Sequence, residues 1–434
     1  MRKRYNAKFF FTFLFFVCSL FYSAFARPFF PKSQLSLKDC IAVGLKHQPD
    51  LKAAREKLKG YLAGKGAALS FYFPRLELDS DYFRGNFFAV QGPLSEIFPG
   101  TFTVYYTQLS ASYVFEDFGK RFARVGKSEA QIEQAVQAYR RERLTVIFRI
   151  SKAYYHLLKE EAFLKLRGDD LKEAQKNLAL AEGLVQTGER SKIVLSEAIV
   201  SRDTAQYDLI RAEHQTADAV DDLNQEMGVS NPPAYKIRAN SSIFPINFTL
   251  MKALALSFHL NPDLLAQKAK VKEEQAEVNE FTAEKWPVLS GSASYGWVDE
   301  VFPPKFSTWN FGVSLTWPFF NGGFLNEKIS EFEALKKREI AKEKALILKI
   351  ENKVERNYRA VQDARSELKA AESEVKAAEE NYRLTLKRYQ LGLSSSAALS
   401  LARADLSLAR AHQVQALSHL RMSEAEVYYS IGMP

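Results

Sequence analysis

Few residues of this chain have the types and spacing that acid–base, metal or nucleotide chemistry needs. The histidines, which could serve as bases or metal ligands, show no metal-site spacing: His47, His156, His214, His259, His412 and His419. Residues 60–66 are one residue shorter than a phosphate-binding loop, have no Ser or Thr after Lys65, and lie in a helix-like stretch. No nucleophile-elbow or dinucleotide-binding motif occurs. The sequence therefore predicts a protein that is not an enzyme and uses no metal or cofactor.

The charged residues give no sign of a nucleic-acid partner. The chain has 60 Lys and Arg against 51 Asp and Glu, a net charge of +9. Residues 1–26 hold four basic residues and no acidic one, so the rest of the chain carries nine minus four, or +5. This excess is small, and most charged residues fall on helix faces opposite apolar rows, as solvated surface does.

Residues 1–26 have the features of a signal peptide. They begin with a basic stretch, continue with an apolar run over residues 9–21, and end at Ala24-Phe25-Ala26, a small-x-small cleavage site. The alternative is a transmembrane anchor, but the run is shorter than the roughly 20 residues that a bilayer requires. Cleavage would remove Cys18, around which no lipidation motif is found, and leave Cys40 without a partner for an intrachain disulfide.

The rest of the chain is a tandem duplication. His47-Gln48-Pro49-Asp50 reappears 213 residues later as Leu260-Asn261-Pro262-Asp263, and Met227-Gly228 reappears 204 residues later as Ile431-Gly432. Two constant offsets that differ by one nine-residue slip predict two repeats with one loop shortened in the second. We place the repeats at residues 27–228 and 249–434, with an equatorial linker at 229–248. Such pseudo-symmetric units readily assemble into rings.

Each repeat contains two segments in which apolar and polar residues alternate, which is the pattern of a strand with one apolar face. The predicted strands span about residues 72–83, 101–116, 287–298 and 306–318. Each has about the length of a tilted membrane strand, and the serine-rich opposite faces suit a wet lumen. We expect five aromatic residues on the apolar faces to contact lipid: Tyr113, Phe115, Trp297, Trp309 and Trp317.

A small soluble sheet is the alternative explanation of these strands. The predicted secretion signal, the serine-rich faces and the connection to long helices favour a membrane β-barrel, and no run of 18 apolar residues follows residue 26 to form a helical span. Four strands cannot close a barrel, because open sheet edges in lipid leave backbone groups unpaired. The smallest membrane barrels have about eight strands, so either two or three copies would have to assemble.

Long helices are predicted over residues 119–186 and 323–390, which lack proline and repeat an apolar residue every seventh position. At 1.5 Å per residue, each would be roughly 100 Å long. Return helices over 191–227 and 395–431 alternate leucine with alanine, and helices over 36–70 and 249–284 precede the strands. A return helix stacked end to end on a helix that precedes the strands would have about the length of one long helix. An antiparallel coiled-coil hairpin is the simpler alternative.

The turns between the long and return helices lie at the end of the molecule farthest from the strands. Glycine at each turn can take the left-handed conformation that ends a helix. We predict these tips to be docking sites, because exposed loops on a rigid scaffold commonly carry partner contacts. The tip residues are Gly188, Glu189, Arg190, Gly392, Leu393, Ser394 and Ser395.

These features together resemble the TolC-like outer-membrane efflux proteins. The resemblance is carried by Tyr389-Gln390-Leu391-Gly392 running into Ser395, by its counterpart Val185-Gln186-Thr187-Gly188, and by Pro318-Phe319-Phe320-Asn321-Gly322-Gly323. It implies a homotrimer in which twelve strands form an outer-membrane β-barrel and twelve helices form an α-barrel across the periplasm of a Gram-negative bacterium. It further implies a periplasmic adaptor and an inner-membrane pump as partners, and tips that meet the adaptor and close the resting channel.

One departure from the family concerns the gate. Some relatives carry acidic residues just past the second tip, where this chain reads Ala397-Ala398-Leu399-Ser400-Leu401. The constriction is therefore expected to be apolar or basic, and the gate candidates are Arg190, Lys192, Glu197, Tyr389 and Leu399. The predicted function is a passive exit duct for efflux or type I secretion. The alternative is a non-conducting periplasmic coiled-coil adaptor or tether.

Overall fold

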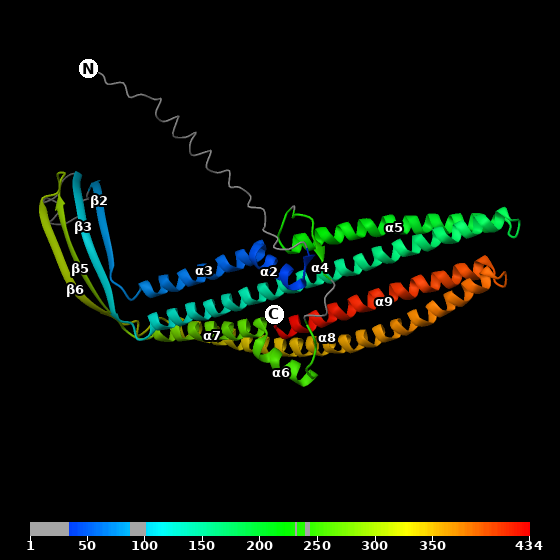
Figure 1. The fold of residues 1–434 in the computed structure, drawn as a ribbon. Coiled ribbons are helices and arrows are strands. Elements are labelled where there is room, and N and C mark those ends of the chain that lie inside the picture. The colour runs from blue at the N-terminus through cyan, green and yellow to red at the C-terminus, as the bar shows by residue number, and fades with distance from the viewer. Residues whose placement is uncertain (1–33, 87–100, 231, 239–243) are drawn as a thin grey trace, which may run out of the picture.

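The protein is elongated, with a sheet at one end, two helical hairpins at the other, and a thicker middle (Figure 1). The computed structural model describes residues 34–86, 101–230, 232–238 and 244–434. The predicted signal peptide and residues 87–100, which hold most of the long loop expected in the first repeat, lie outside these ranges. Among the described residues, no helix is long and apolar enough to cross a lipid bilayer.

Two long helices run the length of the molecule. Helix α4 (Lys120–Gln186) and helix α8 (Phe324–Gln390) have 67 residues each. Each begins after a glycine with positive φ, Gly119 or Gly323, where the chain turns out of the sheet. Several members of the predicted apolar rows are buried, among them Ile150, Leu157, Leu171, Val354, Val361 and Val375.

Each long helix is flanked by two shorter helices (Figure 1). Toward the tips, α4 packs against α5 (Lys192–Glu226), and α8 packs against α9 (Ser396–Ile431). Toward the sheet, α4 packs against α3 (Pro49–Ser70) and also against α7 (Pro262–Ala283), which in turn contacts α8. Helix α4 also contacts α9, so it connects the two repeats along its whole length.

The structure corrects the prediction of one continuous helix before each pair of strands. Residues 36–70 form α2 (Leu37–His47) and α3, and residues 249–284 form α6 (Leu250–Leu260) and α7. The breaks fall at Gln48 and Asn261, whose ψ angles of 121° and 117° are those of extended backbone. Each residue precedes a proline, which disfavours helical geometry at the position before it and is itself well suited to the first helical turn.

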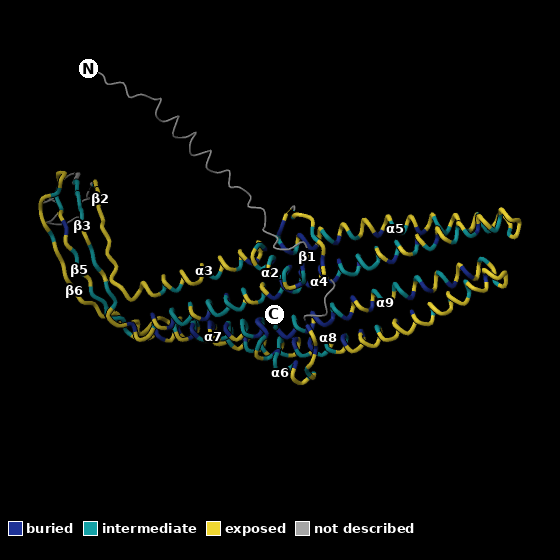
Figure 2. The backbone as a smooth tube through the Cα atoms, in the orientation of Figure 1, coloured by how far each residue is buried: buried dark blue, intermediate teal, exposed yellow. Residues whose placement is uncertain are grey.

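The described part of the linker and the short helices α2 and α6 build the middle of the molecule, where buried residues gather (Figure 2). Within the predicted linker, β4 (Lys236–Ile237) pairs in parallel with β1 (Gln34–Leu35). The core beneath them includes Leu35, Cys40, Ile150, Tyr154 and Leu223. Burial raises the pKa of the Cys40 thiol to about 12, so this cysteine is an inert core residue.

Four antiparallel strands form the sheet in the order β2-β3-β5-β6. Their bounds are Arg75–Asn86 for β2, Thr101–Glu116 for β3, Val288–Asp299 for β5 and Phe306–Thr316 for β6. The predicted alternation in β3 ends at a bulge between Val114 and Glu116, where the register shifts by one residue. Within the described residues, β2 and β6 each pair on one side only, so the sheet has two open edges.

The register gives the sheet two different faces. One cross-strand row is apolar and consists of Leu78, Leu109, Tyr295 and Trp309. The neighbouring row is on the other face and is polar: Glu77, Ser110, Ser294 and Asn310. The apolar face is uncovered, since the exposed fraction of Trp309 and of Phe311 is 74%.

Candidate gate at the helical tips

The two tips have the same backbone design. Gly188 (φ +77°) follows α4, and Gly392 (φ +75°) follows α8. At the second tip, Gly392 N donates to Tyr389 O and Leu393 N donates to Arg388 O, which is the pairing of a Schellman motif. At the first tip, Gly188 N donates to Val185 O in the same way. The second hydrogen bond, to Leu184 O, comes from Arg190 N, which is one residue farther along the chain than the donor of a Schellman motif. A glycine in the left-handed conformation thus ends the long helix at both tips.

Apolar side chains are exposed at the tips. The exposed fraction is 74% for Leu391, 66% for Leu393 and 69% for Ile193. The predicted tip residues Glu189 and Ser395 are also exposed, and Ser395 caps α9 by accepting a hydrogen bond from Ala398 N at 3.2 Å. Clustered exposed apolar residues at the end of a scaffold are typical of a contact surface.

The structure brings most of the predicted gate candidates together between the two hairpins. Arg190 of the first hairpin lies over the ring of Tyr389 in the second, with the guanidinium carbon 5.3 Å from the ring centroid. Glu197 of α5 accepts a hydrogen bond from Ser396 Oγ of α9 at 2.8 Å. Tyr389 and Leu399 are buried within the chain, whereas Lys192 is exposed.

A polar network that the sequence did not reveal lies farther along the helices. Arg403 of α9 donates to Asp170 O of α4 at 2.6 Å and to Ser201 Oγ of α5 at 2.9 Å. Ser407 Oγ donates to Asp170 Oδ2 at 2.7 Å, and Arg167 pairs with the same carboxylate oxygen at 3.0 Å. We call Arg403, Ser407, Asp170 and Ser201 the inter-hairpin network, because each of these bonds from Arg403 and Ser407 crosses between hairpins.

A second cross-hairpin hydrogen bond joins the two long helices. Tyr382 OH of α8 donates to Glu173 Oε1 of α4 at 2.7 Å. Burial, together with the nearby Glu173 carboxylate, raises the pKa of Tyr382 to about 12. The hydroxyl therefore stays protonated at neutral pH and remains a donor to Glu173.

Departure from repeat symmetry was the signal that could have identified Arg403 and Ser407. At the 204-residue offset, Arg403 corresponds to Ile199 and Ser407 to Asp203. The fold that the repeats share does not require a residue whose charge differs between them, so such a residue indicates a role specific to one repeat. The sequence alone could not pair Arg403 with Asp170, because 233 positions separate them.

At the other end of the molecule, the register places Tyr113, Trp297 and Trp309 on the apolar face of the sheet. Phe115 is in the bulge and packs edge-on against Tyr113, with ring centroids 5.3 Å apart. Trp317 follows β6, and its Nε1 donates to Lys285 O at 3.1 Å. All five predicted lipid contacts therefore lie on the sheet or at its helical end.

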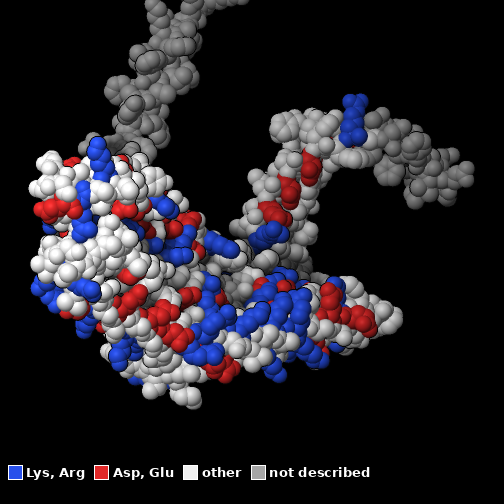
Figure 3. Space-filling model, turned by 90° about the vertical axis from the view of Figure 1, so that its right-hand side faces the viewer, with Lys and Arg blue, Asp and Glu red and all other residues white. Residues whose placement is uncertain are grey.

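The polar face of the sheet carries a row of carboxylates along β2. Glu77, Asp79 and Asp81 share this face, and their partners on β3 are Ser110, Gln108 and Tyr106. Figure 3 shows acidic side chains in a column on the sheet. The two faces thus differ in chemistry in the way that a wall between lipid and water requires.

Comparisons with known proteins agree with this geometry. A family model described as "Outer membrane efflux protein" matches residues 42–229 and 254–433. Among solved structures, the chain is similar to CusC, described in connection with transmembrane channel formation, at 18% identity and a TM-score of 0.79, with 96% of each chain covered. The outer membrane protein VceC of Vibrio cholerae is 19% identical with a TM-score of 0.78, covering 92% of this chain and 96% of VceC.

A third similar structure is the open state of the MtrE outer membrane channel of Neisseria gonorrhoeae. It is 18% identical, with a TM-score of 0.75, and the match covers 92% of this chain and 89% of MtrE. At identities this low, the structural similarity establishes a shared fold and nothing more specific. The family match extends over both repeats, and thus over most of the chain.

Proposed function

The chain belongs to the outer membrane efflux protein family and has the fold of TolC-like channels, and from this premise we propose that it is the exit duct of a tripartite efflux pump or type I secretion system. The duct is passive, crosses the outer membrane and extends through the periplasm, and is gated at its periplasmic tips. Residues 1–26 are its signal peptide, 27–228 and 249–434 its repeats, and 229–248 its equatorial linker.

One observation carries the proposal: a sheet with one apolar and one polar face ends in two open edges and continues into long helices. In lipid, the unpaired backbone groups of β2 and β6 would each cost several kcal/mol. Pairing β6 of one copy with β2 of the next removes both edges. Three copies give twelve strands around a polar lumen, with the aromatic residues of the apolar face in contact with lipid.

The tips are the docking surface for a periplasmic adaptor, which connects the duct to an inner-membrane pump. The exposed Leu391, Leu393 and Ile193 support this assignment, since they would become buried in such a contact. Photo-crosslinkers placed at Arg190 and Ser394 should capture the adaptor in cells. Crosslinkers at Lys59, which is exposed on α3 far from the tips, should not capture it.

The gate is the set of contacts that hold the two hairpins of each copy together. These contacts are all non-covalent and all cross between hairpins: Arg190 on Tyr389, Ser396 on Glu197, Tyr382 on Glu173, and the inter-hairpin network. Their removal would allow α8 and α9 to swing away from α4 and α5.

The test is conductance in planar lipid bilayers. The purified wild-type protein should insert and conduct weakly, and the Tyr382→Phe/Arg403→Ala double variant should conduct markedly more. Arg410→Ala is the matched control, because Arg410 lies on α9 near Arg403 but pairs with Glu379 of its own hairpin at 2.9 Å. Its conductance should equal that of the wild type.

The two parts of the proposal fail separately. A processed protein that is a stable monomer in detergent-free buffer, or that never conducts, contradicts the duct. Equal conductance of the double variant and the Arg410→Ala control contradicts the gate and leaves the duct standing.

A further inference from the structure

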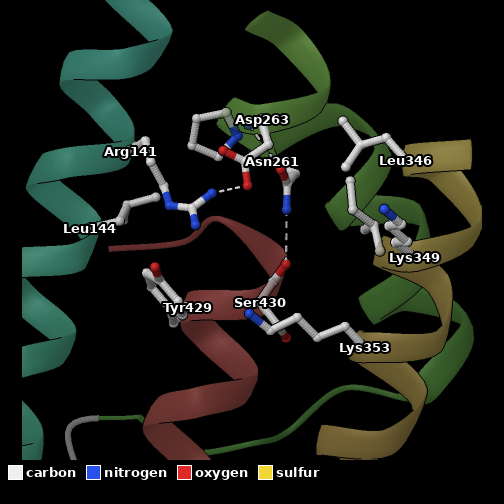
Figure 4. A pocket seen from close by; sticks show the side chains of 11 residues that line it. Arg141, Leu144, Asn261, Asp263, Leu346, Lys349, Lys353, Tyr429 and Ser430 are labelled. Carbon is white, nitrogen blue, oxygen red and sulfur yellow. Dashed lines mark hydrogen bonds and ion pairs between the residues drawn. The ribbon is translucent and has the colours of Figure 1, made fainter. Parts of the chain in front are cut away.

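A cavity of about 120 Å³ lies where α9 ends and α7 begins, flanked by the long helices α4 and α8. Asn261 joins the two helix ends by donating from Nδ2 to Ser430 O at 3.1 Å. One water needs roughly 10–15 Å³ of such space, so the cavity has room for a small solute. Figure 4 shows Arg141 on one side of the cavity and Lys349 on the other, with Lys353 below.

The cavity is rich in positive charge. Arg141, Lys349 and Lys353 line it, and the only acidic residue among the described lining residues is Asp263, which pairs with Arg141. No ion pair within the described part of the chain includes Lys349 or Lys353. Lys353 lies over the ring of Tyr429, with Nζ 5.1 Å from the centroid. The cavity thus has an excess of two positive charges.

The first repeat shows how the same place looks when its charge is neutralised. Arg149, which corresponds to Lys353 at the 204-residue offset, is surrounded by three carboxylates. Its guanidinium lies 2.9 Å from Asp50, 3.4 Å from Glu142 and 3.4 Å from Glu226. The first repeat therefore supplies its own anions at the junction between α5 and α3.

The second repeat lacks two of these three carboxylates. Asp50 corresponds to Asp263, but Glu142 corresponds to Leu346 and Glu226 to Ser430. Moreover, Thr145 of the first repeat corresponds to Lys349, so the second repeat has one more cation at a place where it has two fewer anions. All of the second-repeat counterparts line the cavity.

We propose that this cavity is a binding site for a small divalent oxyanion, which takes the place of the carboxylates of Glu142 and Glu226 in the first repeat. Lys349 and Lys353 bind the oxyanion, and Arg141, held by Asp263, completes the positive wall. The amide groups at the start of α7 take no part, because Asn261 Oδ1 already accepts from Asp263 N and Leu264 N. Bound anion links α8 to the junction of α7 and α9.

The class of ligand follows from the charge and the size. Two lysines that line a space of this volume match a dianion with several acceptor oxygens, such as a phosphate group or a small dicarboxylate. Inorganic phosphate and malonate are therefore the probes. They distinguish a phosphate ligand from a dicarboxylate ligand, because a site shaped for phosphate will bind phosphate more tightly than malonate, and a site shaped for a dicarboxylate will do the reverse.

The experiment measures binding of each probe to the purified full-length protein by calorimetry, and thermal stability as a function of probe concentration. A bound ligand stabilises the folded state and the effect follows its binding curve, whereas exclusion of phosphate from the protein surface raises stability without a site. We expect saturable binding of at least one probe. The Lys349→Gln/Lys353→Gln variant should bind it at least about tenfold more weakly, since it cannot make the charge-assisted hydrogen bonds of the two ammonium groups.

Two further variants sharpen the result. Lys344→Gln removes an exposed lysine of the same helix that does not line the cavity, and should bind as the wild type does. Leu346→Glu restores a first-repeat carboxylate without removing any cation, and should abolish binding even if the double lysine variant does not fold. The proposal is overturned if neither probe binds the wild type, or if the lysine and Leu346→Glu variants respond as the wild type does. Neither result depends on conductance, so the site is tested independently of the duct.

Discussion

The two repeats share a backbone design but differ in the charges placed on it. Both have a left-handed glycine before the long helix, a left-handed glycine at the tip, and a proline that starts the helix leading to the sheet. At the start of α4, Asp117 and Arg121 form a buried ion pair 2.9 Å apart, whereas the second repeat has Asn321 and Leu325 at these positions. Glycine, proline and apolar periodicity therefore suffice for the shape.

Three of the charged differences between the repeats lie where separate elements of the fold meet. Arg121 connects α4 to the ends of β3 and α3, Arg403 connects the two hairpins, and Lys349 and Lys353 line the cavity between helix ends. At each of these places, the aligned residues of the other repeat carry a different pattern of charge. Specific function is thus expected at the positions where the repeats disagree.

The largest predicted effect on stability is at the start of α4, where the two repeats differ in charge. Arg121 donates to Val114 O at 2.8 Å and to Phe115 O at 3.3 Å, and pairs with Asp117 in a buried setting. Arg121→Ala should lower the free energy of unfolding by about 3–5 kcal/mol, because it leaves a buried carboxylate without its partner. Chemical unfolding of the purified protein in detergent measures the change.

The matched variant is Asp117→Asn/Arg121→Leu, which copies the pair found in the second repeat. It should lose less stability than Arg121→Ala, since no uncompensated charge remains buried. An equal or greater loss in the double variant would show that the carbonyl contacts of Arg121, and not its ion pair, stabilise this junction.

A smaller predicted effect is the difference in stability loss between a glycine substitution in the middle of the molecule and one at a tip. Gly228 and Gly188 both have positive φ, but a Cβ on Gly228 would lie 2.9 Å from Gln48 Cα, whereas a Cβ on Gly188 would meet open space. Gly188→Ala should cost about 1–2 kcal/mol from backbone conformation alone. Gly228→Ala should cost roughly 1–3 kcal/mol more, because two backbone segments must move apart. Thermal unfolding of both variants decides, and equal losses would contradict the close packing at Gln48.

How much could be predicted from the sequence depended on whether the signal was periodic. Alternation predicted the two-faced sheet, and the heptad rows predicted buried residues, of which Ile150, Leu157 and Val361 are clear examples. The family resemblance was confirmed by a match over both repeats. The tip turns were recognisable because glycine with positive φ ends a helix whatever the surrounding fold.

Features that depend on single residues or distant partners could not be predicted in this way. The break at Gln48 was missed because a helical pattern continues on both sides of Pro49, and the bulge at Val114–Glu116 leaves no trace in the alternation before it. The two-residue pair of β1 and β4 is too short to give a pattern. Arg403 finds Asp170 only after two hairpins have packed, and that packing is a tertiary event.

The smallest predicted effect concerns pH and a carboxylate that only the second repeat has. Glu339 of α8 is 3% exposed and corresponds to Ala135 in α4. Its carboxylate accepts hydrogen bonds from Lys342 at 2.8 Å, from Gln267 at 2.9 Å and from Arg338 at 2.8 Å. Burial acts to raise the pKa of Glu339, but these hydrogen bonds outweigh it and lower the pKa to about 2.

Since this pKa is lower in the folded state than the ordinary value of 4.5, the ionised carboxylate stabilises the fold above about pH 4.5, and the contribution is lost as pH falls toward 2. At pH 7, Glu339→Gln should therefore be less stable than the wild type by about 1–2 kcal/mol, and the difference should disappear near pH 2. Glu333→Gln, at an exposed position of the same helix, should change stability by less than about 0.5 kcal/mol at any pH. A difference between wild type and Glu339→Gln that persists unchanged from pH 7 to pH 2 would mean that packing, and not charge, holds α8 against Gln267 of α7.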